Sequence, residues 1–521
     1  MREPSERGLA AVLLLGHVMS DPPNVVATAP PHPPRHRSVL DRALLSGVAW
    51  TAGVKWGTQI LSWAATLVVA RLLTPADYGL FGMAMVFQAF LGSIYDLGLA
   101  SAIIQRRDLS EEQLARLGGL SMLYGVGFAV LTVALAGPIA RFYREPAVEW
   151  ILLVLAGASL IDALQIMPRA VLARDLQFRK IALIDGFSAL VLTAATLGFA
   201  FAGFRYRALV YGHVVDAVLS TVLALVVAPH RFSWPRRATG IGGAMTYGWQ
   251  VALSRIAAYV AANADFAVVG RVLGKAPLGA YTFGWTIATI PVDRIASLVA
   301  RVIPSVFSPI QRDPAAMRRY WLGVTEGLAF VVLPAAVGLA VTADDFVRVV
   351  LGERWEPAIA PLRLLALYGG IRALTAVVSP ILVATGHAKR NLQFTLLAAA
   401  VLPLLFYLGT RWGTVGVAAA WIVGFPAVSL PAFVFTLRLL QTRPGAYLRA
   451  VSPALTATAA MAVTLVAIRL LTPALPTGTR FALQVISGAV TYGAIVLAFH
   501  RPRIDAFRGL LRNARVAEAG D

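Results

Sequence analysis

Long apolar stretches are the feature that most restricts what this chain can fold into. Fourteen of them are about 20 residues long, which is the length that a helix needs to cross the hydrocarbon layer of a membrane. With approximate boundaries they lie at 46–70, 79–104, 117–138, 148–167, 181–203, 207–229, 244–270, 279–307, 321–342, 358–384, 392–410, 413–437, 450–471 and 481–500. The sequence therefore predicts an all-α integral membrane protein with about 14 transmembrane helices.

Composition and charge agree with a membrane protein. Charged residues make up 14% of the 521 residues, the mean hydropathy is +0.71, and the net charge is +20. A soluble domain is usually about a quarter charged. In a soluble protein such a charge would suggest a nucleic-acid partner, but Lys and Arg retained in cytoplasmic loops explain it here without nucleic acid. The chain has no Cys, which excludes a thiolate metal site and a cysteine nucleophile.

Basic residues alternate between loops along the chain. They concentrate in every second loop and in the C-terminal tail, at 106–116, 169–180, 231–237, 312–319 and 501–515. The loops between these carry only one or two, such as Arg71 and Arg411. Because basic loops remain in the cytoplasm, both termini are predicted to be cytoplasmic.

One short segment is repeated in the sequence. VARLLTPADYGLF (Val69 to Phe81) returns as VGRVLGKAPLGAY (Val269 to Tyr281), 200 residues later. Three further pairs follow in the same order: IIQRRD and PIQRD, the two runs that begin EPA at 145 and 356, and the two runs that end in LQF at 178 and 394. The alternative is a chance likeness between helices rich in Leu, Ala and Gly. Polar landmarks in the same order favour a duplication instead.

The duplication predicts the domain organisation. Each copy has an even number of spans, so both keep the same orientation in the membrane, as in a parallel repeat about an axis along the membrane normal. We expect a first six-helix bundle at 41–235, a second at 236–440 and two additional transmembrane helices at 441–500. A cytoplasmic tail follows at 501–521.

The first 40 residues differ from the rest. They contain the Pro-rich run PPHPPRHR (Pro30 to Arg37), which cannot form a helix. We interpret 1–40 as a disordered cytoplasmic tail or the result of a misplaced start codon. The alternative is a cleaved signal peptide, because Leu9 to Met19 form a short apolar core.

The paired bundles indicate an alternating-access transporter rather than an enzyme. A membrane glycosyltransferase or polymerase would need paired carboxylates or metal ligands facing a large soluble loop. No loop between the predicted spans exceeds about 20 residues, and the chain has no Asp-x-Asp, P-loop or histidine cluster. We therefore expect no catalytic residues, no resident metal and no cofactor.

The stretch ARLLTPADYGLFGMAMVFQAFLGSIYDLGLASAIIQR (Ala70 to Arg106) resembles the start of bacterial oligosaccharide flippases. These form the polysaccharide biosynthesis branch of the multidrug/oligosaccharidyl-lipid/polysaccharide exporter superfamily. The similarity covers roughly Leu44 to Leu440, and the terminal helix pair fits members with fourteen spans. It implies a multi-pass protein of the bacterial inner membrane that moves undecaprenyl-pyrophosphate-linked oligosaccharides for O-antigen, capsule or exopolysaccharide synthesis.

A pyrophosphate that crosses a low-dielectric layer needs fixed cations around it. Lys55 lies within the first predicted span and Arg255 at the equivalent place in the seventh, again 200 residues apart. Arg294 and Arg301 in the eighth span are further candidates for a cavity that binds the pyrophosphate. The alternatives are snorkelling to lipid headgroups for Lys55 and Arg255, and a structural ion pair with Asp293 for the other two.

Asp265, in the same predicted span as Arg255, is a candidate for coupling to H⁺ or Na⁺. Its alternative is a residue near water at the outer end of the span. Six aromatic residues are candidates for sugar stacking, although such residues also serve as interface anchors and packing: Trp50, Trp56, Trp63, Trp249, Tyr259 and Trp285.

Two other cargoes within the superfamily stay open: cationic drugs, exported by cation coupling, and lipid II. A drug exporter would favour an acidic cavity, which the paired cations oppose. We expect a monomer, because two bundles complete a pathway, with membrane lipids, a polysaccharide polymerase and glycosyltransferases as partners.

Overall fold

The structure is a computed structural model that describes residues 64, 66–95, 110–230, 232–233, 242–290 and 313–500. These residues form helices and connecting turns and contain no strand. All of them belong to one compact unit. The elements are α3 (Pro75–Tyr95), α5 (Glu111–Tyr143), α6 (Pro146–Arg174), α7 (Phe178–Phe201), α8 (Tyr206–Val227), α9 (Gly242–Val272), α11 (Pro314–Phe346), η1 (Val347–Leu351), η2 (Glu353–Ala358), α12 (Ile359–Thr375), α13 (Val378–Ala384), α14 (Ala388–Gly409), η3 (Thr410–Trp412), α15 (Gly413–Leu439), α16 (Pro444–Leu471) and α17 (Thr477–Phe499).

These helices confirm the predicted all-α membrane fold. The described residues contain nine helical stretches that are long and apolar enough to cross a membrane, one of which holds both α14 and α15. Further helices at 66–72, in α3, in α9 and at 275–290 stand where other spans are expected. The boundaries predicted for the tails, the bundles and the terminal pair stay predictions.

One predicted span is interrupted. The sequence predicts a single helix over 358–384, but a turn at Ala376 and Val377 separates α12 from α13. Pro380 lies four residues after Ala376, and a proline has no N–H with which to bond the carbonyl group four residues earlier. Pro380 therefore contributes to the break, although Pro168 lies inside the unbroken helix α6.

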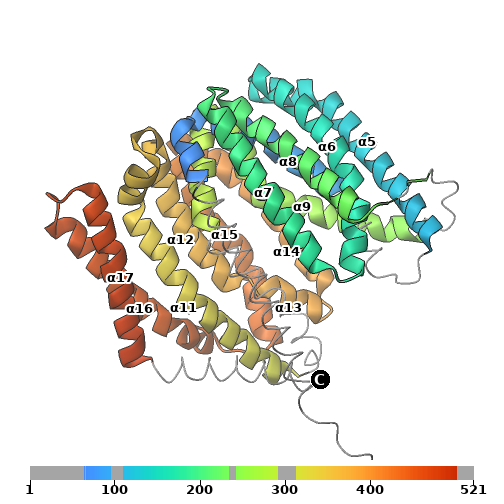
Figure 1. Cartoon of the computed structure of the whole chain (residues 1–521). Helices are drawn as coiled ribbons and strands as arrows, with labels where there is room; N and C mark the ends of the chain where they lie inside the picture. Colours follow the sequence, from blue (N-terminus) through green and yellow to red (C-terminus); the bar gives the residue numbers. More distant parts are fainter. Residues whose placement is uncertain are drawn as a thin grey trace, which may run out of the picture. The chain divides into compact units, whose positions relative to one another are not determined.

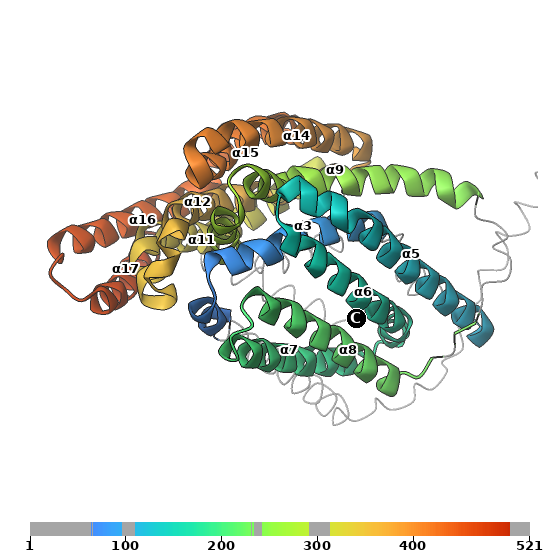
Figure 2. The ribbon, with the colours of Figure 1, turned by 90° about the horizontal axis from the view of Figure 1, so that it is seen from above.

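The helices of the two halves pack in matching pairs. In the first half α5 packs on α6, α7 on α8, and α6 on α8; in the second, α11 packs on α12, α14 on α15, and α12 on α15. The terminal helix α16 packs on α11 and on α17, which places this pair beside the second bundle (Figure 1). The view in Figure 2 shows α14 and α15 side by side, with α9 beside α14.

The duplicated segment has the same structure in both copies. A helix ends, a two-residue turn follows, and the next helix begins: the turn is Leu73–Thr74 in the first copy and Leu273–Gly274 in the second. Asp77 stabilises the first turn, because its Oδ2 accepts hydrogen bonds from the amide and the hydroxyl of Thr74 at 3.0 and 2.6 Å. The segment is therefore the hairpin between the first two helices of each half.

Candidate functional site

Only two of the five predicted site residues fall in the part of the chain that the structure describes. Arg255 and Asp265 both lie on α9. Lys55, Arg294 and Arg301 lie outside the described residues, so the expected cluster of cations stays a prediction.

Arg255 is half-buried on a face of α9 that is turned toward the first half. It precedes Tyr259 by four residues, and residues four apart share one face of a helix. The Tyr259 hydroxyl donates a hydrogen bond of 2.5 Å to the carbonyl of Val86 in α3, and the Tyr259 ring lies 5.7 Å from that of Phe90. The side of α9 that carries Arg255 therefore meets the first half at α3.

Asp265 lies in the interior of the second half and is fully buried. Its Oδ2 accepts hydrogen bonds from the hydroxyl of Tyr281 at 2.7 Å and from Nε1 of Trp421 at 2.9 Å. Its Oδ1 accepts none from the described residues. Asp265 therefore does not lie near water at the outer end of its span, which was the alternative. The helices α9, 275–290 and α15 enclose its carboxyl group.

Aromatic rings surround the Asp265 group. Trp421 lies 4.6 Å from Tyr368, 4.7 Å from Phe406 and 5.4 Å from Trp285, measured between ring centroids. Trp285 therefore has a packing role here, as Tyr259 does against α3. The side chains of Trp50, Trp56, Trp63 and Trp249 lie outside the described residues.

The two halves contact each other at one end of the bundle. Nζ of Lys275, in the second half, lies 3.0 Å from Oε2 of Glu145 in the first. The Arg71 guanidinium of the first half donates to the carbonyls of Val349 and Val350 in the second. Each hairpin of the duplicated segment thus reaches the third and fourth helices of the other half. The charge pattern predicts that this end faces outward.

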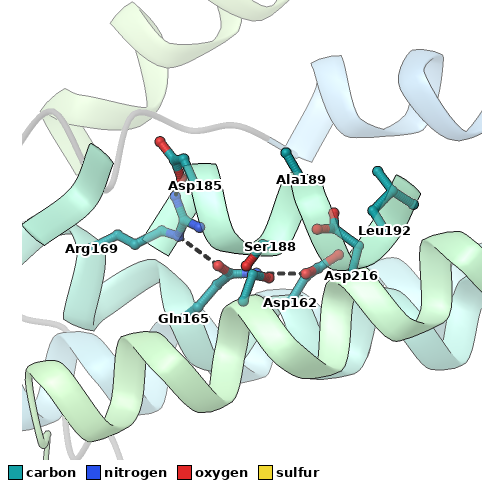
Figure 3. Close-up of a pocket in the computed structure, with 9 residues that line it drawn as sticks. Asp162, Gln165, Arg169, Asp185, Ser188, Ala189, Leu192 and Asp216 are labelled. Carbon is teal, nitrogen blue, oxygen red and sulfur yellow. Dashed lines mark hydrogen bonds and ion pairs between the residues drawn. The ribbon is translucent and has the colours of Figure 1, made fainter. Parts of the chain in front are cut away.

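A cavity of about 410 Å³ lies inside the first half, between α6, α7 and α8 (Figure 3). Asp162, Asp185 and Asp216 line it together with Arg169. None of these four residues is among the site residues predicted from the sequence. Side chains from three helices converge here, and the spacing along one helix gives no signal of that.

Comparison of sequences relates the chain to proteins of surface-polymer synthesis. The family described as "Polysaccharide biosynthesis protein" matches residues 68–360. The teichuronic acid biosynthesis protein TuaB of Bacillus subtilis (strain 168) is 26% identical over 476 residues, which cover 87% of this chain and 95% of TuaB. The lipopolysaccharide biosynthesis protein WzxC of Escherichia coli (strain K12) is 24% identical, with 74% and 79% covered. The succinoglycan biosynthesis transport protein ExoT of Rhizobium meliloti (strain 1021) is 24% identical, with 78% and 82% covered.

Comparison of structures finds transporters. The lipid II flippase MurJ in an inward closed conformation matches with a TM-score of 0.68 and 15% identity, over 88% of this chain and 100% of MurJ. A multidrug resistance MATE family transporter of the MOP superfamily, in an inward-facing conformation, matches with a TM-score of 0.60 and 15% identity, over 73% and 94%. At this identity the likeness shows the fold alone. The match to this family and to the succinoglycan transport protein ExoT agrees with the predicted transporter rather than with the enzyme alternative.

Proposed function

Because the chain belongs to the family of polysaccharide biosynthesis proteins, we propose that it is a flippase for lipid-linked oligosaccharides. Its substrate is an oligosaccharide unit on undecaprenyl pyrophosphate, which it moves across the bacterial cytoplasmic membrane for the synthesis of O-antigen, capsule or exopolysaccharide. The observation that carries the proposal is the match over most of the chain to proteins named for three different surface polymers.

The proposed mechanism is alternating access, in which one bundle rocks against the other. The polyprenyl tail stays in the lipid while the pyrophosphate and sugars pass between the halves. Arg255 supports this role, because it lies on the face of α9 that meets the first half. Lys55, Arg294 and Arg301 are proposed to complete the set of cations that balances the pyrophosphate charge.

Asp265 is proposed to couple this movement to H⁺ or Na⁺. A buried carboxyl group with one oxygen unbonded among the described residues is suited to gain or lose a cation as its surroundings change. The protein is proposed to work as a monomer with both termini in the cytoplasm, next to the polymerase and glycosyltransferases of the same polysaccharide.

Deletion of the gene in its own bacterium tests the substrate. We expect less surface polysaccharide and an accumulation of complete lipid-linked units on the cytoplasmic face, and a plasmid copy should restore both. If neither pool changes while drug sensitivity rises, the cargo is a drug. If lipid II accumulates instead, the glycan is the peptidoglycan precursor. Either result contradicts the proposal.

Variants of Arg255 test the cationic site in the same strain. Arg255→Ala should fail to complement at normal membrane levels, and Arg255→Lys should complement in part because it keeps the charge. Arg438→Ala is the matched control, since Arg438 is an exposed residue in the last turn of α15. Full complementation by Arg255→Ala would remove Arg255 from the site.

A further inference from the structure

The cavity of the first half is lined by polar side chains at the depth of the membrane interior. Asp162 on α6 lies about 24 Å from the start of that helix and about 18 Å from its end, at 1.5 Å per residue. Asp216 stands near the middle of α8. Carboxyl groups at this depth are costly and need a compensating partner. The carboxylates of this cavity therefore need groups that balance their negative charge.

Two carboxyl groups of the cavity, those of Asp162 and Asp216, accept no hydrogen bond from a cationic side chain of the described residues. Arg169 gives its Nη1 to Oδ1 of Asp185 at 2.6 Å and its Nε to the amide oxygen of Gln165 at 2.5 Å. Gln165 in turn donates through Nε2 to Asp162 at 2.6 Å. Asp216 accepts no hydrogen bond from the described residues. The guanidinium thus pairs with Asp185, and Asp162 receives only a neutral amide (Figure 3).

Negative charge exceeds positive charge around Asp162 and Asp216. Three carboxylates and one guanidinium line the cavity. His213, on α8, is the further titratable group that interacts with both Asp162 and Asp216. Without His213, the three carboxylates and the one guanidinium carry a net charge of −2 when all four are ionised. One added cation would halve this charge.

A second observation points to a bound species. Ser188 on α7 lines the same cavity and is only 3% exposed, yet its hydroxyl has no hydrogen-bond partner among the described residues. Buried hydroxyl groups are nearly always paired, so an unpaired one indicates a ligand or water that completes the set. Figure 3 shows Ser188 in the middle of the lining residues, near Gln165 and between Arg169 and Asp162.

We propose that Asp162, Asp216 and Ser188 form a binding site for a monovalent cation, a proton or Na⁺. Both are balanced by carboxylate and hydroxyl oxygens, which are hard ligands. The Asp185 side chain at the Arg169 end is 52% exposed, and that end lies toward the loop predicted to be cytoplasmic, so the ion enters from there. This site lies in the opposite half from Asp265. Its use to drive transport rests on the proposed function, whereas binding does not.

Infrared difference spectroscopy of the full-length protein in detergent tests the site without any substrate. One arm lowers the pH from 8 to 5 in choline buffer, and the other adds Na⁺ at pH 8. We expect carboxyl bands that respond in at least one arm and that disappear in both Asp162→Asn and Asp216→Asn. Ser188→Ala should weaken the responding titration by about fivefold in ion concentration, as expected for one hydrogen bond.

Asp175→Asn is the control, since that carboxylate lies in the loop after α6 with a side chain 41% exposed. It should keep the responding bands. A response to acid alone identifies a proton, and a response to Na⁺ at pH 8 identifies Na⁺. Bands that persist in both Asn variants, or a Ser188→Ala protein that titrates like the wild type, would overturn the proposal. If the wild-type protein binds the cation but does not move lipid-linked oligosaccharides, the proposed function is contradicted and the binding site is not.

Discussion

Gly79 and Gly279 occupy the same position in the two copies of the duplicated segment, and they meet where the copies cross. A Cβ atom on Gly79 would lie 1.7 Å from the carbonyl oxygen of Lys275, and one on Gly279 would lie 1.7 Å from that of Pro75. Lys275 and Pro75 are themselves 200 residues apart. The contact is therefore reciprocal, as a two-fold relation between the halves requires, and it depends on the absence of a side chain at both positions.

Alanine at either glycine should separate the two copies. The added methyl would overlap a backbone carbonyl, which cannot move without its helix, so we expect Gly79→Ala and Gly279→Ala each to cost about 1–3 kcal/mol. Thermal unfolding in detergent measures this. Gly82→Ala on the same helix is the control, because its Cβ would lie 3.6 Å from Oγ1 of Thr282. Equal melting temperatures for all three variants would show that the two copies have room for a side chain at Gly79 and Gly279.

A covalent link across the same end tests whether the halves must separate. The chain has no Cys, so Glu145→Cys with Lys275→Cys places the only thiols at the observed ion pair. A short reducible crosslinker should stop transport of the lipid-linked substrate, and reduction should restore it. The control is Glu112→Cys with Arg116→Cys, one turn apart on α5. Transport that continues at full crosslinking would exclude the rocking of one bundle against the other.

The sequence predicted most helices because apolar runs of spanning length need no tertiary information. It was less successful at their ends. The prediction begins the third span at 117, whereas α5 begins at Glu111, where Ser110 and Gln113 form a capping box. These polar residues continue the helix beyond the apolar run, so a hydropathy window misses them.

The candidate sites show a different limit. Asp265 was a candidate from the sequence because an ionisable residue inside a span is rare, but its partner Trp421 lies 156 residues away. Likewise, the positions of Asp162 and Asp216 in the sequence do not indicate that their side chains line the same cavity. Their convergence depends on how α6 and α8 are rotated about their axes, and that rotation is decided by packing in three dimensions.

The terminal helix pair should depend on one buried ion pair. The guanidinium of Arg480 on α17 contacts both carboxylate oxygens of Asp345, and the two side chains are 17% and 1% exposed. Arg480→Ala leaves that carboxylate buried and unpaired, which should cost about 3 kcal/mol, and Arg480→Lys should cost less. Thermal unfolding with proteolysis of the 440–443 connection measures this. Arg116→Ala, at an exposed pair, should change little, and an equal effect of both alanine variants would contradict this account.

Docking of the segment after α8 should depend on pH through His230. Its Nε2 lies 3.2 Å from the carbonyl oxygen of Leu114 on α5, and the amide of Ser233 donates to the carbonyl of Ala115 at 3.0 Å. Burial lowers the pKa of His230 below its ordinary value, although the hydrogen bond with Leu114 opposes this. The detached segment therefore binds protons more readily than the docked one, so docking is complete above the ordinary value of about 6.5 and weakens as the pH falls below it.

Limited proteolysis at pH 8 and pH 5 measures this docking. Cleavage of the segment at 228–233, relative to the connection between α16 and α17 in the same molecule, should increase at pH 5. His230→Gln should abolish the increase, because a glutamine side chain can still bond the Leu114 carbonyl but does not titrate. Cleavage that increases equally in the wild type and in His230→Gln would assign the pH response to another group.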